Sequence, residues 1–313
     1  IERHSCVITL THAGYIKRQP ADTYSAQHRG GRGIIGMSTK DEDFIEKVIA
    51  VNSHSYLMMF TNTGKVQMRK AYLIPEAGRA AKGTNIVNVL PLEAGEYVTA
   101  GLAVREFDDS FLVMITRMGT VKRVELSALN TARKAGIRAL SLDEGDELIT
   151  VLKTTGSDCI TIATEQGMAI CFNENDVRPM GRDAAGVRGI TLSEGDFVVG
   201  AEKAEEGKTL LTVTERGFGK RTELSEYLRT GADGEKTAQS RGGKGLKNYN
   251  ITSKTGKVAG CRVVAETDDI MLIESGGVII RIPASSINIY KRDTMGVIVM
   301  RIEEGNKVVS IER

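Results

Sequence analysis

Two glycine-rich segments carry residue types that bind phosphate. Residues 26–34 read AQHRGGRGI and residues 238–246 read AQSRGGKGL, so nearly the same loop occurs twice, more than two hundred residues apart. Because glycine loses the most backbone freedom on folding, such a loop must serve a purpose. Its glycines let backbone N–H groups approach an anion, and its Arg and Lys side chains donate charge-assisted hydrogen bonds to phosphate oxygens. We interpret both segments as candidate phosphate-binding loops.

Other kinds of chemistry have less support. Gly31, Gly33 and Gly36 spell GxGxxG, but no βαβ pattern follows, and the GxxxxGK[ST] loop of nucleotide-binding proteins does not occur. The four histidines lie within the first 54 residues and the four cysteines show no CxxC spacing, so we expect no metal site. No cluster of Asp and His suggests a catalytic residue. No apolar run of 18 residues predicts a membrane span, so we expect a protein of the reducing cytoplasm.

The elements that would position these loops form a sixfold repeat. Each repeat has an apolar strand, a short polar turn with a glycine, and a second strand, as in FLVMITRMGTVKRV. Glycine at this point supplies the positive φ of a tight hairpin. The six pivot glycines are Gly14, Gly64, Gly119, Gly167, Gly217 and Gly277.

Further positions recur behind each pivot glycine. A second glycine follows, then a third strand (such as VRGITL), an acidic turn and a fourth strand; this glycine is Gly33, Gly83, Gly136, Gly186, Gly245 or Gly296. The longer spacing before Gly245 indicates an insertion near RTGADGEKTAQ. An apolar or aromatic residue ten positions after each pivot predicts a shared core position, occupied by Tyr24, Ile74, Leu129, Val177, Tyr227 and Ile287.

Six units of four strands predict an all-β protein, a six-bladed β-propeller in one domain. We place the units at approximately 1–52, 53–105, 106–154, 155–204, 205–265 and 266–313. A parallel β-helix is the structural alternative, but its repeats are shorter. The lack of tryptophan argues against a WD40 propeller.

Charge alternates within the repeats although the net charge is only +2. The windows from each pivot glycine to one residue past the second glycine hold 24 Lys and Arg against 11 Asp and Glu, and the remaining segments hold 18 against 29. We therefore expect a basic rim around the ring, interrupted at unit four, which is the footprint of a bent polyanion. Its expected members are Lys17, Arg18, Lys65, Arg69, Lys70, Arg79, Lys82, Lys122, Arg123, Arg133, Lys134, Lys220, Arg221, Arg281 and Arg292.

Over essentially its whole length, the sequence resembles the C-terminal domain of DNA gyrase A. That family carries a seven-residue box of the form Q(K/R)RGG(K/R)G. Gln27, His28, Arg29, Gly30, Gly31, Arg32 and Gly33 fit it at every position except the second, where His28 replaces a permanent cation. Gln239, Arg241, Gly242, Gly243, Lys244 and Gly245 resemble a second, variant copy, with Ser240 at the second position.

The resemblance implies a β-pinwheel, a propeller variant in which neighbouring blades exchange strands. It implies that the domain wraps double-stranded DNA around its basic perimeter, so that the parent ATP-dependent topoisomerase can introduce negative supercoils. The implied partners are the N-terminal breakage-reunion domain of the same polypeptide, together with gyrase B, in a bacterial cytoplasm at the nucleoid. The domain itself would be a monomer without catalytic residues or cofactors, because the catalytic tyrosine, ATP and Mg²⁺ belong elsewhere in the enzyme.

Two alternatives remain open at this point. The corresponding domain of topoisomerase IV looks similar but lacks an intact box. A propeller can also be a platform for protein partners, which would place aromatic and Met residues on its exposed turns.

Overall fold

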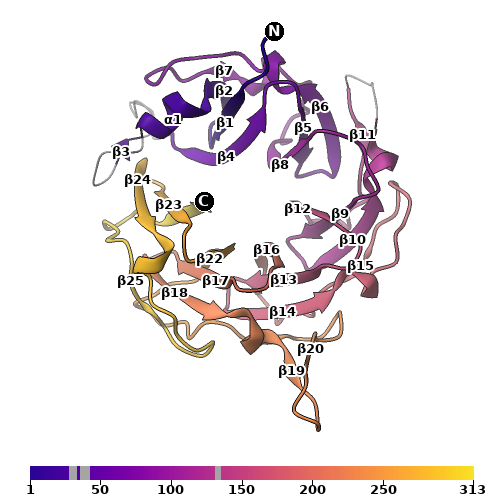
Figure 1. Cartoon of the computed structure of the whole chain (residues 1–313), viewed down its shortest axis with the longest axis vertical. Coiled ribbons are helices and arrows are strands. Elements are labelled where there is room, and N and C mark those ends of the chain that lie inside the picture. The colour runs from indigo at the N-terminus through magenta and orange to yellow at the C-terminus, as the bar shows by residue number, and fades with distance from the viewer. Residues whose placement is uncertain (28–33, 36–42, 131–134) are drawn as a thin grey trace.

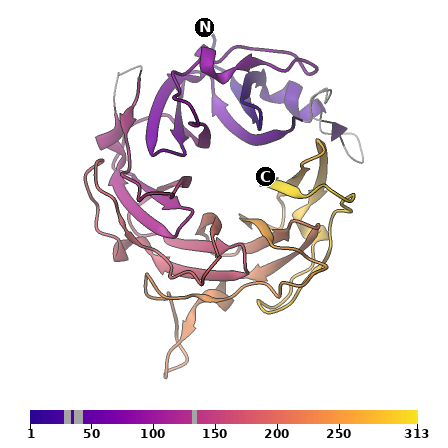
Figure 2. The same ribbon diagram turned by 180° about the vertical axis from the view of Figure 1, so that it is seen from behind.

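The computed structural model describes residues 1–27, 34–35, 43–130 and 135–313. The described strands form six four-stranded antiparallel sheets, which stand as blades around a central opening (Figure 1). Figure 2 shows the same ring from behind. The prediction of an all-β, six-bladed propeller with four strands per blade is confirmed.

Each blade runs from an inner strand at the channel to an outer strand at the perimeter. From blade 1 to blade 6, the inner strands are β4 (Ile45–Asn52), β8 (Val98–Val104), β12 (Leu148–Thr154), β16 (Val198–Ala204), β22 (Val258–Val264) and β26 (Val308–Glu312). The next strands are β1 (Ser5–Thr11), β5 (Tyr56–Thr61), β9 (Phe111–Thr116), β13 (Cys159–Thr164), β17 (Thr209–Thr214) and β23 (Asp269–Glu274). The strands in third place are β2 (Tyr15–Pro20), β6 (Lys65–Lys70), β10 (Thr120–Glu125), β14 (Met168–Asn173), β18 (Phe218–Glu223) and β24 (Val278–Pro283). The outer strands are β7 (Thr84–Asn85), β11 (Ile137–Arg138), β15 (Val187–Arg188), β21 (Leu246–Lys247), β25 (Val297–Ile298) and β3 (Ile34–Ile35).

The outer strand of every blade comes from a neighbouring repeat. For example, β7 follows β5 and β6 in the chain but pairs with β2 of blade 1, with Tyr15 opposite Asn85. The ring closes in the same way, because β3 from the first repeat pairs with β24 of blade 6 through Ile34 and Ile35. The strand exchange implied by the resemblance is therefore present in all six blades.

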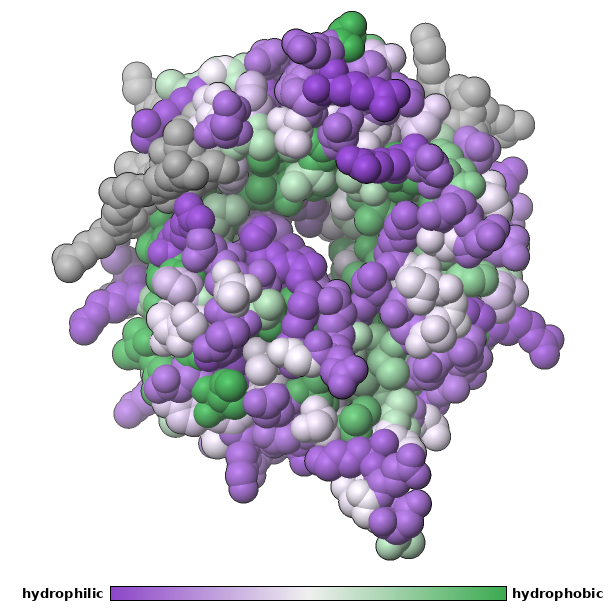
Figure 3. Space-filling model, in the orientation of Figure 1, coloured by the Kyte–Doolittle hydropathy of each residue, from purple (hydrophilic) through white to green (hydrophobic). Residues whose placement is uncertain are grey.

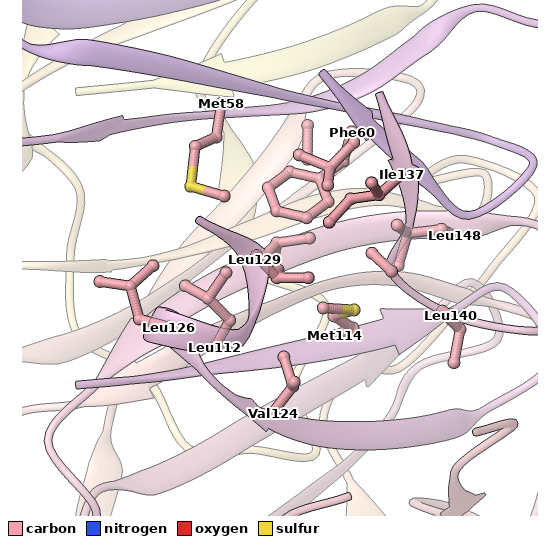
Figure 4. Packing of buried hydrophobic residues seen from close by; sticks show 14 of the residues in the cluster. Met58, Phe60, Leu112, Met114, Val124, Leu126, Leu129, Ile137, Leu140 and Leu148 are labelled. Carbon is pink, nitrogen blue, oxygen red and sulfur yellow. The ribbon is translucent and has the colours of Figure 1, made fainter. Parts of the chain in front are cut away.

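The apolar cores lie between neighbouring blades. Met58 and Phe60 of β5 face Leu112 and Met114 of β9, so the sheets of blades 2 and 3 pack face to face (Figure 4). Five further clusters fill the other blade interfaces. The shared core position is confirmed, since all six of its residues are buried.

Short helices connect the strand in third place of each blade to the next crossover. Five repeats use 3₁₀ turns: η1 (Ala71–Leu73), η3 (Leu126–Leu129), η4 (Glu174–Asp176), η5 (Leu224–Tyr227) and η6 (Ala284–Ser286). The first repeat instead forms α1 (Ala21–Gln27), and η2 (Ile86–Asn88) follows β7. The outer strands are much shorter than the strand expected after the second glycine. After two paired residues the chain turns inward and buries apolar side chains such as Leu90 and Ile190.

In the five repeats where it is described, the second glycine makes the strand exchange sterically feasible. Gly186 has a φ of +91°, and a Cβ there would lie 2.6 Å from the carbonyl oxygen of Val121 in blade 3. Gly195 has a similar φ of +77° but open space around it. We expect Gly195→Ala to cost about 1–2 kcal/mol of backbone strain. Gly186→Ala should cost a further 1–3 kcal/mol or so, because a backbone carbonyl must move.

Urea unfolding followed by circular dichroism compares these two glycine variants directly. Equal losses of stability at the two positions would contradict the role assigned to Gly186.

Arg262 ties the inner strands of three blades together in the central channel. The inner strands line a cavity of about 450 Å³. From β22, Arg262 Nη1 lies 2.6 Å from Glu202 Oε1 of β16, and Nη2 lies 2.5 Å from Glu312 Oε2 of β26. Figure 3 shows the opening face-on, with hydrophilic side chains beside it. Ion pairs in the channel therefore join the last strand to the inner strand of the neighbouring blade.

Candidate nucleic-acid interface

Three lysines expected on the rim are buried instead. Lys17 is 4% exposed, and Lys122 and Lys220 are 0% exposed. The Lys220 Nζ donates to the carbonyl oxygens of Lys291, Arg292 and Thr294 at 2.6–2.9 Å, and all three belong to the next repeat. Burial lowers the pKa of Lys122 to about 8 and that of Lys220 to about 7. The expectation that these side chains form an exposed basic surface is wrong, because they serve as donors for the crossover chain that covers them.

The arginines that follow these lysines are buried as well. Arg18, Arg123 and Arg221 each donate from Nε to the carbonyl oxygen of the next repeat's shared core residue, at 2.6–3.0 Å. Arg123 Nη1 also lies 3.2 Å from Glu174 Oε1, and their side chains are 7% and 0% exposed. These arginines therefore fasten neighbouring repeats and, like the lysines, do not form the exposed rim predicted for them.

The second box-like loop packs against two blades. Arg241 Nε donates to the Asp176 carbonyl oxygen at 2.9 Å, and its Nη1 donates to that of Arg188 at 2.7 Å. The Gln239 Nε2 donates to the Tyr227 carbonyl oxygen at 2.8 Å. Gly242 N donates to the Gly189 carbonyl oxygen, and Gly243 O accepts from the amide of Thr191. In this loop Lys244 is the cation left exposed, since Arg241 is used by the fold.

The other expected rim residues differ in exposure and in their partners. Arg79 is exposed, whereas Lys65 pairs with Glu93 and Arg281 pairs with Asp269. Lys70 lies over the Tyr56 ring and Lys82 over the Tyr15 ring. Arg69 and Arg292 are half-buried, with Arg69 Nη1 donating to the Met68 carbonyl oxygen and Arg292 Nη1 to that of Lys247. Gln27 ends α1, and residues 28–33 of the box, together with Arg133 and Lys134, lie outside the described residues.

The outer strands carry three cations that were not among the expected rim residues. Arg138, Arg188 and Lys247 are each the second residue of an outer strand, in blades 2, 3 and 4 respectively. All three are exposed, and their side chains form no hydrogen bond or ion pair with the described part of the chain. Each lies two positions after the second glycine of its repeat. That fixed offset is the sequence signal that could have identified them.

The acidic turns lie at the end of the ring that carries the pivot hairpins. Asp146 Oδ1 accepts from the amides of Met118 and Glu147, and Asp196 Oδ1 accepts from Gln166 and Phe197. Both aspartates are buried, so one carboxylate of each turn anchors it to the pivot hairpin of its own repeat. Negative charge is thereby held beside the pivot hairpins.

The described residues give no indication of a metal centre or a membrane span. No group of three His, Cys, Asp or Glu side chains there is placed to hold a metal ion. In the same residues, no helix is long and apolar enough to cross a membrane.

Comparisons with known proteins agree on one family. The model of the DNA gyrase C-terminal domain, a β-propeller, matches residues 7–52, 55–105, 110–155, 160–205, 208–238, 237–265 and 268–313. The chain is 49% identical to DNA gyrase A of Clostridium acetobutylicum and 41% identical to that of Escherichia coli K12, in both cases over its whole length. It spans 37% and 35% of those two relatives.

Solved structures show the same fold. A DNA gyrase A C-terminal domain matches with a TM-score of 0.82 and 28% identity, covering 98% of this chain and 99% of that one. The C-terminal domain of a DNA topoisomerase IV matches with a TM-score of 0.77 and 25% identity, covering 100% and 94%. From the six matched repeats and the identity over the whole chain, this protein belongs to the DNA gyrase C-terminal domain family.

Proposed function

We propose that this chain binds double-stranded DNA without sequence preference and bends it around its outer wall. The observation that carries the proposal is the recurrence of an exposed cation, without a partner in the described part of the chain, at one position of three successive outer strands: Arg138, Arg188 and Lys247. A stiff polyanion gains contacts along such an arc only if it curves. Arg79, Lys244 and Lys291 add exposed cations on the crossover loops.

Phosphate contacts must offset the cost of bending. Curving 20–30 bp through 40–90° costs on the order of 1–6 kcal/mol. Release of counterions from about 6–10 phosphates contributes a favourable binding free energy that depends on salt. The affinity for DNA is therefore expected to fall by about 10³–10⁵ between 50 and 200 mM salt. Contacts to phosphates carry no base information, which suits DNA wrapping at any sequence.

A gel-shift experiment with a generic duplex of ~40 bp, longer than the bend scale above, tests the proposal. We expect a shifted complex at 50 mM salt and a large loss of it at 200 mM. No shift at the lower concentration would contradict DNA binding, and a salt-independent shift would contradict phosphate contacts.

We further propose that the box at 27–33 fastens one end of the wrapped duplex. Its arginines and glycines support this role, and we expect Arg29→Ala with Arg32→Ala to reduce wrapping more than binding. A ligation assay measures wrapping as a shift in linking number, and an unchanged shift would contradict the prediction. The pair Arg241→Ala and Lys244→Ala should have a smaller effect on wrapping, because Arg241 is bonded to backbone carbonyls.

Within a whole gyrase, the bent DNA would be presented to the breakage-reunion domain of the same polypeptide. Strand passage driven by ATP on gyrase B would then introduce negative supercoils. We propose that the chain itself acts by binding alone, as a monomer without catalytic residues or cofactors, in the bacterial cytoplasm.

Two other functions make different predictions. A topoisomerase IV domain would bind DNA but depend less on the box, so the Arg29 and Arg32 variant separates the two enzymes. A platform for protein partners is favoured by exposed apolar residues, among them Met118 and Tyr97 on or next to turns and the pair Val297 and Ile298 in β25. It would leave the gel shift negative at both salt concentrations.

A further inference from the structure

The insertion in the fifth repeat forms a hairpin that projects from the outer wall. Strands β19 (Arg229–Thr230) and β20 (Lys236–Thr237) pair with Arg229 opposite Thr237 and Thr230 opposite Lys236. Viewed along the short axis of the ring, they point radially outward (Figure 1), and the view from behind agrees (Figure 2). The family match is divided at this place, into 208–238 and 237–265. The hairpin is therefore an addition to the common repeat.

The hairpin has a defined backbone structure, but its side chains do not belong to a hydrophobic core. Gly231 N donates to the Glu235 carbonyl oxygen at 2.8 Å, and Glu235 N donates to Asp233 Oδ1 at 3.0 Å. All residues from 229 to 237 are exposed, and Ala232 is the one apolar side chain among them. The projection at the bottom of Figure 3 is accordingly mostly hydrophilic. A defined shape without a packing role indicates that the hairpin acts on something outside the ring.

Charge is distributed unevenly along the hairpin. Arg229 and Lys236 lie at its base, whereas Asp233 and Glu235 lie at or near its tip. Strands β19 and β20 each have two residues, so at roughly 3.3 Å per residue the paired part of the hairpin is about 7 Å long, and the turn at 231–235 extends beyond it. The base is thus compatible with a nearby phosphate chain, and the tip repels one.

The chain leads from the hairpin to the last cation of the outer-strand arc. After β20 the chain returns to blade 4, where Gln239 N donates to the Cys171 carbonyl oxygen of β14, and it reaches Lys247 in β21. Figure 1 shows the hairpin outside β14 of blade 4, so a duplex that follows Arg138 and Arg188 in the plane of the ring meets it at the blade that carries Lys247. Beyond it, the outer strand of blade 5 offers Val297 and Ile298 and no cation, and the exposed Lys291 of this blade lies on the crossover loop instead.

We propose that this hairpin is a steric barrier that ends the in-plane path of the DNA at the boundary of blades 4 and 5. It turns the duplex out of the plane of the ring and so fixes where the DNA leaves the wall. This proposal rests on the proposed function.

The test is a variant in which residues 229–237 are replaced by Gly-Ser-Gly. A three-residue link is sufficient because residues 229 and 237 are directly paired, and all six sheets remain intact. Hydroxyl-radical footprinting measures the protected length on a long linear duplex, and titration measures the affinity. We expect a longer footprint and a Kd within about twofold of the wild-type value, since the barrier acts by shape.

Asp233→Asn with Glu235→Gln is the matched control, because it removes the charge of the tip and keeps its shape. Its footprint should equal that of the wild-type chain. An unchanged footprint after the deletion overturns the barrier, and a shorter footprint with weaker binding shows instead that the hairpin grips DNA. Absence of DNA binding by the intact chain contradicts the proposed function and the barrier together, whereas binding with an unaltered footprint contradicts the barrier alone.

Discussion

Replacing Arg123 by alanine is expected to lower the free energy of unfolding by about 3–5 kcal/mol, because it leaves a buried carboxylate without its ion-pair partner. Glu174 is fully buried and accepts hydrogen bonds from Arg123 Nη1, Thr154 Oγ1 and the amide of Asp158. Arg123 also lies over the Phe111 ring. Chemical denaturation followed by circular dichroism measures the loss.

Arg281→Ala is the control for this prediction. Its ion pair with Asp269 is solvent-exposed, so its removal should cost no more than about 1 kcal/mol. A second variant, Arg123→Met with Glu174→Gln, removes both charges and should recover part of the stability. If Arg123→Ala cost as little as Arg281→Ala, the buried ion pair would not be holding the repeats together. The Arg123→Ala variant should lose DNA binding only to the extent that the protein is unfolded.

The triple variant Arg138→Ala, Arg188→Ala, Lys247→Ala is expected to bind DNA on the order of 10²-fold more weakly at 0.1 M salt. Each lost phosphate contact lowers the slope of log K against log[salt] by about 0.9, so the slope should fall by about 3. The three side chains are exposed and have no partner in the described part of the chain, so stability should change little. Fluorescence anisotropy at several salt concentrations gives both quantities.

A triple variant with the same change in net charge provides the control. Arg105, Lys254 and Arg301 are exposed but lie outside the outer strands. Their replacement by alanine should leave the salt slope close to that of the wild-type chain. Equal effects of the two triple variants would mean that total charge governs binding, and would contradict an arc of contacts on the outer wall.

The fold was largely predictable because its constraints are local and repeated. Each pivot glycine marks a hairpin, and each shared core residue such as Val177 fills the space between two sheets. The strand exchange was not derivable from the pattern and came from the family resemblance. An outer strand of two residues, such as β15, is too short to reveal its partner, and the pairing is decided by packing between repeats.

The interface was harder to predict, because the sequence alone suggests that Lys and Arg residues close to a hairpin glycine are exposed to solvent. Lys220 and Arg221 are adjacent in β18, and both were expected on the rim. The crossover chain of the next repeat buries both side chains, and its carbonyl oxygens require donors. Sequence pattern alone does not show such coverage. In contrast, Arg138 lies on a strand that ends a sheet, where nothing further covers it.

The closure of the ring by β3 has a consequence for biosynthesis. At the other five junctions the chain itself passes from one blade to the next, but blades 6 and 1 are joined through an arm that leaves blade 1 between α1 and β4. The landing site of that arm, Val278–Pro283, leaves the ribosome more than two hundred residues later. Because β3 is synthesised well before its partner strand β24, the ring stays open at this junction until β24 has been made.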